Sequence, residues 1–308
     1  VSVAFFLATL LAGAPRVRRY SRGFTYSDAW VDDARLVVLT ALDAQERGAV
    51  VLPRTRCETL RRDGASWTAS LVHADGSRRT VRARAVANAT GPWVARFLDD
   101  ASPVRARHHP RMIKGSHVVV PRIYEHPFAY LFQAPDGRVV FTIPFADDFT
   151  LIGTTECDYT GDLATPAIDQ PEVDYLLGMT NRYFARDLSR KDVVWTFAGL
   201  RPLLATSADD PKSVTRDYVI EVDTHGPPLL SVYGGKITTY RKLAEDVVDR
   251  LAAGLGNRSE HWTATAPLPG GDMPRADFDA FLASLEARYT QMPAALLHRY
   301  ARAYGTRI

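Results

Sequence analysis

The chain of 308 residues has only two cysteines, and it lacks the features that mark several common protein classes. Cys57 and Cys157 lie far apart and form no C-x-x-C pair, which argues against a disulfide framework or a zinc site and fits a reducing cytosol. His108 and His109 are adjacent rather than four residues apart, so they indicate no metal site on a helix. We therefore expect no bound metal.

Charge and hydrophobicity argue against two further classes. The net charge is only +3 and no long block of like charges occurs, so nucleic-acid binding has little support. Residues 1–14 (VSVAFFLATLLAGA) carry no charge, but they are too few to cross a bilayer and lack the basic start of a signal peptide. We interpret them as a core or peripheral helix within a longer chain, and we expect the helical residues 277–308 to continue beyond Ile308.

Glycine-rich phosphate loops are also missing from the sequence. None of the 20 glycines forms the G-x-G-x-x-G loop that binds the pyrophosphate of a dinucleotide. A Walker A loop is excluded because Leu230 stands where its first glycine is required, and Ile237 follows Lys236.

The hydrophobic pattern predicts an α/β fold with an antiparallel insertion. Residues 26–49 predict a helix capped by Ser27 or Asp28, and residues 49–63 and 67–91 predict strands. With a later strand, glycine turn and helix, this order favours a parallel sheet covered by helices. The middle of the chain instead predicts successive antiparallel strands, with a hairpin turn at Pro135-Asp136-Gly137 and a helix over 170–184.

The stretch SVYGGKITTYRKLAEDVVDRL predicts a strand, a Gly-Gly turn and an amphipathic helix capped by Thr238 or Thr239. Lys236, Arg241 and Lys242 crowd the start of this helix, where the helix dipole is already positive. These cations are favourable if an anionic or electron-rich ligand binds at the turn. The alternative is that all three are simply solvated.

Four residues together indicate chemistry on an anionic alcohol. His117 supplies a base that titrates near neutral pH, while Arg201, Arg216 and Lys236 supply cations suited to a phosphate or carboxylate. No neighbouring acidic run offers both arginines an obvious partner. Such a set suits proton removal from an anionic alcohol, although a lone histidine is more often structural.

The chain resembles the FAD-dependent, quinone-reducing glycerol-3-phosphate dehydrogenases. The resemblance runs from about Phe24 to Asp272, continues in YARAYGT, and rests on these phrases: FTYSDAWVDDARLV, ARAVANATGPWV, IKGSHVVVPR, FTIPFADDFTLIGTTECDY, LSRKDVVWTFAGLRPL, TRDYVIEV, SVYGGKITTYRKLAE and LPGGD. The family's dinucleotide loop, which precedes YSD, is absent here, so the resemblance is to a fragment that also lacks part of the C-terminal domain.

The resemblance implies a domain order. A partial FAD-binding, Rossmann-like domain would comprise residues 1–105 and 226–265. A substrate domain of antiparallel sheet and helix would comprise residues 106–225, and residues 266–308 would begin a C-terminal helical domain. FAD is the implied cofactor, and these residues would lie beside it: Asn88, Ala89, Thr90, Gly91, Gly234, Gly235, Thr238, Thr239, Arg56 and Cys57. Without the dinucleotide loop we expect the chain to hold FAD weakly.

The resemblance also assigns roles in the reaction. His117 would be the general base for the C2 hydroxyl of glycerol 3-phosphate, Arg201 and Lys236 would polarise the C2 oxygen, and Arg216 would bind the phosphate. Cations and helix-end N–H groups near Gly234 would stabilise negative charge on the reduced flavin. Lys114 is better suited to a structural role.

For the whole protein the resemblance implies dihydroxyacetone phosphate as product, quinone as electron acceptor, and a peripheral position on the cytoplasmic membrane. It leaves a homodimer open. Two alternatives remain: an oxidase that passes the electrons to oxygen, and a non-catalytic fragment that binds at most a small anion.

Overall fold

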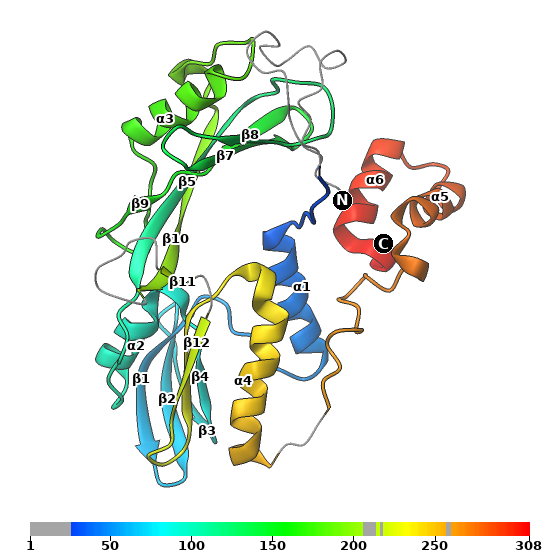
Figure 1. Ribbon diagram of the computed structural model, residues 1–308. Coiled ribbons are helices and arrows are strands. Elements are labelled where there is room, and N and C mark those ends of the chain that lie inside the picture. The colour runs from blue at the N-terminus through cyan, green and yellow to red at the C-terminus, as the bar shows by residue number, and fades with distance from the viewer. Residues whose placement is uncertain (1–25, 206–213, 216–217, 257–259) are drawn as a thin grey trace. The chain divides into compact units, whose positions relative to one another are not determined.

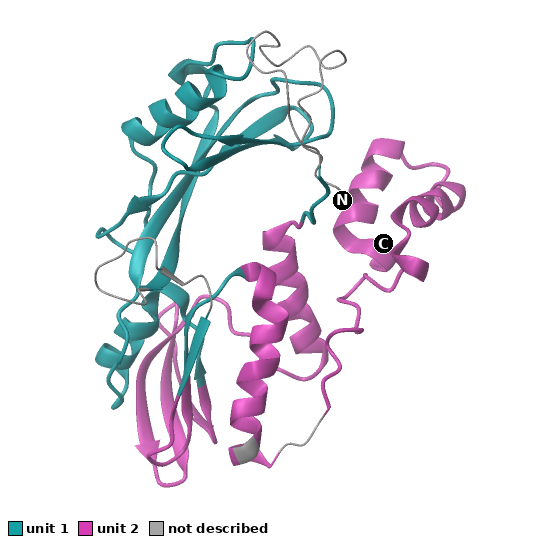
Figure 2. Ribbon diagram, viewed as in Figure 1, with its two compact units in different colours: residues 1–30, 87–221, 231–236 teal, residues 31–86, 222–230, 237–308 magenta. Residues whose placement is uncertain are grey.

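The computed structural model describes residues 26–205, 214–215, 218–256 and 260–308 (Figure 1). Two compact units can be distinguished. The first comprises residues 1–30, 87–221 and 231–236, and the second comprises residues 31–86, 222–230 and 237–308 (Figure 2). The predicted helix at residues 1–14 and the segment around Arg216 lie outside the described residues.

The first unit is built on a seven-stranded sheet, which contains the antiparallel strands that the sequence predicted for the middle of the chain. Its strands are β5 (Arg111–Pro121), β6 (Tyr130–Gln133), β7 (Val139–Phe145), β8 (Phe149–Gly153), β9 (Cys157–Asp158), β10 (Trp195–Ala205) and β11 (Val214–Thr215). The order is β11-β10-β5-β8-β7-β6, β9 also pairs with β5, and these neighbours run antiparallel. Strand β5 is therefore central, with β10 on one side and β8 and β9 on the other.

The predicted hairpin turn between β6 and β7 is confirmed. Gly137 has a φ of 85°, which glycine adopts without strain, and the backbone N–H of Gly137 donates to the carbonyl of Ala134 at 2.9 Å. The turn thereby sets the register Phe132 to Val140.

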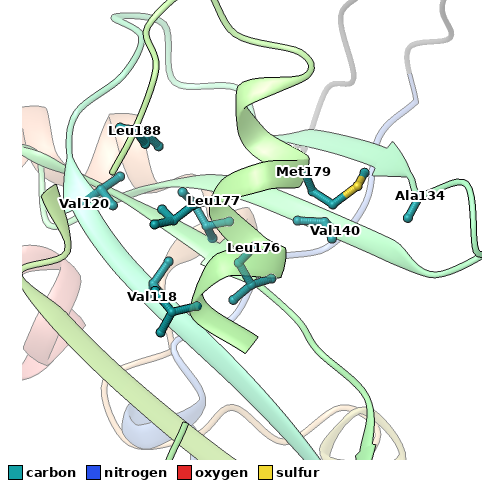
Figure 3. Close-up of a cluster of buried hydrophobic side chains, with 10 residues drawn as sticks. Val118, Val120, Ala134, Val140, Leu176, Leu177, Met179 and Leu188 are labelled. Atoms are coloured by element: carbon teal, nitrogen blue, oxygen red, sulfur yellow. The ribbon is translucent and has the colours of Figure 1, made fainter. Parts of the chain in front are cut away.

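One face of this sheet is covered by α3 (Gln170–Asn181), the helix predicted from residue 170. Asp169 caps it: the Asp169 carboxylate accepts from the backbone of Glu172, whose own carboxylate accepts from the backbone of Asp169. Apolar side chains of α3, β5 and β7 then form a dry core (Figure 3). Its members include Val118, Val120, Val140, Ile152, Val173, Leu176, Leu177 and Met179.

A buried ion pair lies beside this core. The Nζ atom of Lys114 is 2.8 Å from Oε2 of Glu172, and the two side chains are 8% and 4% exposed. The other oxygen, Oε1, accepts from the hydroxyls of Ser116 at 2.9 Å and Thr155 at 2.6 Å. Burial by itself would raise the pKa of Glu172, but the hydrogen bonds from Lys114 and Thr155 outweigh it and lower that pKa to about 2. The Glu172 carboxylate therefore joins α3 to strand β5 and to the residues that follow strand β8.

The second unit contains a three-stranded antiparallel meander of β1 (Thr55–Asp63), β2 (Ser66–His73) and β3 (Arg78–Ala83). Its strands and the turn at Asp75-Gly76 were predicted. These strands are antiparallel neighbours because the turns between them are only a few residues long. The parallel sheet expected from the order of strands and helices stays a prediction. Trp67 of β2 is fully buried, and its indole N–H donates to the carbonyl of Pro228 at 3.0 Å.

The helix predicted over 26–49 is shorter than expected. It is α1 (Asp33–Glu46), and its cap is Asp32, which accepts from the backbone N–H of Arg35 at 2.9 Å, rather than Ser27 or Asp28. A carboxylate three residues before a free N–H is the usual capping geometry, so the later aspartate starts the helix. Val37 and Val38 remain 59% and 55% exposed.

Further elements lie outside these two sheets. A three-stranded sheet in the order β12-β13-β4 is formed by β4 (Val86–Asn88), β12 (Tyr218–Asp223) and β13 (Leu229–Gly234). Two helices are α2 (Val94–Ala101) and α4 (Tyr240–Leu255). The short 3-10 helices are η1 (Gly91–Trp93), η2 (Arg190–Asp192), η3 (Ile237–Thr239), η4 (Pro274–Ala276) and η5 (Gly305–Arg307). Among the described residues, no helix combines the length and apolarity needed to cross a membrane.

The helical C-terminal pattern forms two packed helices, α5 (Phe278–Arg288) and α6 (Ala294–Tyr304), around buried Leu285, Leu297 and Ala301. The LPGGD phrase has a packing role here. A Cβ on Gly270 would lie 2.2 Å from the carbonyl oxygen of Tyr304, so the backbones at the two positions touch.

The buried pair makes a stability prediction. Lys114→Met keeps most of the side-chain volume but leaves the Glu172 carboxylate buried without its countercharge, so we expect a loss of about 3 kcal/mol in the free energy of unfolding at pH 7. Because the pKa of Glu172 is lowered to about 2 by the fold, the stabilisation is complete above its ordinary pKa of 4.5 and fades as pH falls toward 2. The difference between the two proteins should therefore be smaller at pH 3 than at pH 7.

Urea unfolding of the wild type and the variant at both pH values measures this. Lys191→Met, at an exposed position, is the matched control and should change little. Equal stability of Lys114→Met and the wild type at pH 7 would contradict the prediction.

Candidate active site

The candidate site lies on the face of the seven-stranded sheet opposite α3, which we call the histidine face. Lys114, Ser116 and Val118 of β5 point to α3, as their contacts with Glu172 and the dry core show. Side chains alternate along a strand, so Gly115 and His117 lie on the opposite face. Residues paired directly across neighbouring strands share a face, which brings parts of β8 and β10 into the same site.

His117 is at the centre of the histidine face. It pairs with Phe197 of β10 and with Gly153 of β8. Its imidazole is stacked on the phenyl ring of Phe197, with ring centroids 4.8 Å apart and an interplanar angle of 10°. The Nδ1 atom is buried.

Arg201 lies on the same face and reaches toward His117. It pairs with Ile113, but its Nη2 atom is 3.2 Å from the point where a Cβ on Gly115 would lie. Gly115 is two residues from His117, a step of about 7 Å along a strand. The guanidinium therefore lies beside the residue that is one side-chain position away from His117 on the same face.

The local sequence offers Arg201 no obvious carboxylate partner, but the tertiary structure supplies one. The Nη1 atom of Arg201 donates to Oε1 of Glu156 at 3.0 Å, with both side chains nearly half exposed. Glu156 lies 45 residues away in sequence, just before β9. One edge of the guanidinium is thus held by a carboxylate of the same unit.

The predicted turn after β4 is formed, and Asn88 shapes it. The buried Asn88 amide donates to the carbonyl of Val94 at 3.0 Å and accepts from the Thr90 hydroxyl at 2.7 Å. Gly91 has a φ of 55°, and no atom lies within 4 Å of the position a Cβ would take. The turn therefore presents open backbone around Ala89 and Gly91. Their contact with a cofactor stays a prediction.

The second glycine turn also has the expected backbone. Gly234 ends β13 and Gly235 follows it, with φ values of 75° and 93°, both in the left-handed region that favours glycine. Lys236 is exposed at the end of the turn. Thr239 is the N-cap residue of α4, but its side chain makes no capping hydrogen bond, so that part of the prediction was wrong.

The cations at the start of α4 have a local explanation. Arg241 is 2.9 Å from Glu245, and Lys242 is 2.9 Å from Asp246, in the i,i+4 geometry of helix ion pairs. The pairing offsets their repulsion by the helix dipole. It removes Arg241 and Lys242 as candidates for stabilising flavin charge and leaves Lys236 as the ligand-binding candidate.

Four predicted cofactor residues belong to the second unit: Thr238, Thr239, Arg56 and Cys57. Arg56 is 76% exposed and lies 3.7 Å from Glu58. Cys57 is partly buried, and burial raises the pKa of its thiol, which makes it unreactive at neutral pH. Their contact with a cofactor stays a prediction, and Arg216 lies outside the described residues.

Sequence reasoning missed Gly153, Glu156 and Phe197. Alternation along WTFAGLR does place Phe197 and Arg201 on one face, so that signal was present. Nothing in the local sequence connects Gly153 to His117 or Glu156 to Arg201, because these contacts depend on strand pairing. The described residues contain no group of three or more His, Cys, Asp or Glu side chains that could hold a metal ion.

The chain is similar to several known proteins. The chain is 46% identical over 297 residues to a glycerol-3-phosphate dehydrogenase of Pseudomonas aeruginosa, covering 96% of this chain and 58% of the relative. It is 44% identical over 297 residues to the D-erythritol 1-phosphate dehydrogenase of Brucella abortus (96% of this chain, 59% of the relative). It is also 44% identical over 288 residues to the aerobic glycerol-3-phosphate dehydrogenase of Escherichia coli (92% of this chain, 57% of the relative). The chain thus spans less than two thirds of these relatives.

Among solved structures, the glycerol-3-phosphate dehydrogenase of Bacillus halodurans complexed with FAD is similar, with a TM-score of 0.82 and 31% identity. The match covers 95% of this chain and 57% of that one. These similarities confirm the resemblance found in the sequence. Residues 6–241 match the family described as FAD dependent oxidoreductase. The chain therefore belongs to the FAD-dependent oxidoreductase family.

Proposed function

We propose that the whole protein oxidises sn-glycerol 3-phosphate to dihydroxyacetone phosphate with FAD as cofactor. The observation that carries this proposal is that His117 and Arg201 lie on one face of the sheet, with the Arg201 guanidinium beside Gly115, two residues from His117 along β5. The names of the relatives supply the substrate class. Turnover of glycerol 3-phosphate by the FAD-loaded whole protein, followed with a dye as electron acceptor, tests it.

The chemistry divides between cofactor and protein. When bound, FAD accepts the hydrogen of C2 together with two electrons. The remaining proton, on the C2 hydroxyl, must pass to a base as the C2–O bond becomes a carbonyl. Nε2 of His117 takes that proton, because Nδ1 is buried.

The cations hold and polarise the substrate. Arg201 keeps one edge on Glu156 and has further N–H donors for the C2 oxygen. Lys236 is a second donor at the exposed end of the Gly-Gly turn, and Arg216 binds the phosphate through paired N–H groups. Lys114 has no part in this, because its ammonium is committed to Glu172 on the other face.

The residues present fit FAD at its two glycine turns. Gly91, Gly234 and Gly235 have left-handed backbones, and no side chain crowds the position beside Gly91. Backbone N–H groups can therefore approach an anionic or electron-rich group closely, as cofactor-binding turns require. In this proposal Thr238 and Thr239 lie near the flavin, and Arg56 and Cys57 near the adenosine half.

For the electron acceptor we propose quinone, with the protein peripheral on the cytoplasmic membrane face. The dehydrogenase names of the relatives support this choice over an oxidase. Quinone reduction and peroxide release, measured in parallel with anionic lipid vesicles present, distinguish the two acceptors. Sedimentation with the vesicles measures membrane binding.

A second substrate deserves the same assay, because one relative at 44% identity acts on D-erythritol 1-phosphate. This compound shares the phosphate and adjacent hydroxyls with glycerol 3-phosphate but is one carbon longer. The ratio of kcat/KM values for the two compounds assigns the substrate.

The base assignment makes the second prediction. His117→Ala should lower kcat by about 10²- to 10⁴-fold, because it removes general-base catalysis, while KM changes far less. His225→Ala, at a side chain that is 82% exposed, is the control and should keep normal turnover. Steady-state kinetics of both variants decide this, and near-normal turnover of His117→Ala would make His117 a structural residue.

The phosphate assignment makes the third prediction. Loss of a charge-assisted bidentate contact costs roughly 1.5–3 kcal/mol, so Arg216→Ala should raise KM for glycerol 3-phosphate about ten- to a hundredfold. Use of uncharged glycerol, poor already, should scarcely change. Arg96→Ala, an exposed arginine of the first unit, is the control. An equal loss with glycerol would show that Arg216 supports the fold or the cofactor instead.

A further inference from the structure

The imidazole of His117 is confined between neighbours contributed by two different strands. Phe197 of β10 and Gly153 of β8 are the direct partners of His117 across the sheet. All three therefore lie in one row across the histidine face. Neither Phe197 nor Gly153 has a role in the reaction proposed above, so their fit to the ring calls for its own explanation.

Phe197 limits the tilt of the ring. The two rings are nearly parallel, at 10°, with centroids 4.8 Å apart, which is within the range of favourable offset stacking. Phe197 is nevertheless 43% exposed, so it contributes little to a closed core. A large apolar side chain that is left near solvent but packed on the candidate base is better explained by the orientation of that base.

Gly153 supports the other edge of the ring. A Cβ added there would lie 2.1 Å from Cδ2, 2.6 Å from Nε2 and 2.7 Å from Cγ of His117. Such distances are far below van der Waals contact, so any side chain would push the imidazole away. The backbone of Gly153 is not in the left-handed region, and so the ring itself requires glycine at this position.

We propose that Gly153 and Phe197 form a slot that fixes the orientation of the imidazole of His117. In this proposal Phe197 is a positioning residue that acts through His117, and it rests on the proposed base function of His117. Nε2 lies over Gly153, and Nδ1 is buried. A methyl group on Gly153 would therefore both move the ring and occupy the space next to the reactive nitrogen.

The test uses the FAD-loaded whole protein with four substitutions. Phe197→Leu removes the ring but keeps apolar bulk, Phe197→Tyr keeps the ring, and Gly153→Ala fills the slot. Trp195→Leu is the matched control, because Trp195 is an exposed aromatic residue of the same strand and face, two residues away. Circular dichroism shows which variants fold.

We expect Phe197→Leu to lower kcat about tenfold and Gly153→Ala to lower it about a hundredfold, since a displacement of about 1 Å of a catalytic group has effects of this size. KM for glycerol 3-phosphate should change by less than about threefold. Phe197→Tyr should retain most of the wild-type kcat, and Trp195→Leu should match the wild type. If Gly153→Ala does not fold, the comparison of Phe197→Leu with Phe197→Tyr provides the test.

A second readout does not depend on activity. A phenyl ring stacked on an imidazole shifts the nuclear magnetic resonance signal of the imidazole C–H groups upfield, and the His117 signal is identified by its loss in His117→Gln. Phe197→Leu should move this signal downfield, and Trp195→Leu should not. The slot is refuted if Phe197→Leu leaves the His117 signal or kcat unchanged, or if Trp195→Leu has the same effect as Phe197→Leu. If the wild type does not oxidise glycerol 3-phosphate, the proposed function fails, and the His117 signal alone then decides whether the slot exists.

Discussion

The carboxylate of Glu172 is the constraint on which the first unit depends. A charge buried this deeply is tolerated only when its oxygens are satisfied, and Lys114, Ser116 and Thr155 satisfy them here. Two of these partners are alternate residues of β5. A shift of β5 by one residue would turn Lys114 and Ser116 away from α3 and bury His117 in their place. The ion pair therefore determines the face on which the candidate base lies, without itself touching any reactant.

From this register the rest of the site follows by strand pairing. β10 places Phe197 beside His117, and Arg201 four residues further along reaches back over Gly115 to meet Glu156. The His117 ring lies close to the backbone of Gly153, and the Arg201 guanidinium lies close to the backbone of Gly115, because neither glycine has a side chain in the way. The site is thus built from a polar end around Arg201 and a flat, apolar end around Phe197, with the imidazole between them.

The start of α4 illustrates how local pairing changes the meaning of a charge pattern. In sequence, Lys236, Arg241 and Lys242 form one basic cluster at the end of the helix that repels cations. In the structure Arg241 and Lys242 are neutralised by carboxylates one turn later, while Lys236 lies before the helix on the Gly-Gly turn. The explanation for the cluster is therefore divided: helix ion pairs account for two of the cations, and the ligand proposal retains the third.

The sequence by itself determined the α/β class, the hairpin at Pro135-Asp136-Gly137, the helix that begins at Gln170 and the family, because turn residues, caps and long phrases are local signals. It also singled out His117 and Arg201 as individual residues. Only the tertiary structure decided that Lys114 faces away from them, that Glu156 holds Arg201, and that Phe197 and Gly153 enclose the imidazole. Those contacts join residues about 36 to 80 positions apart through the register of antiparallel strands, and that register depends on side-chain burial across the whole sheet rather than on any local pattern.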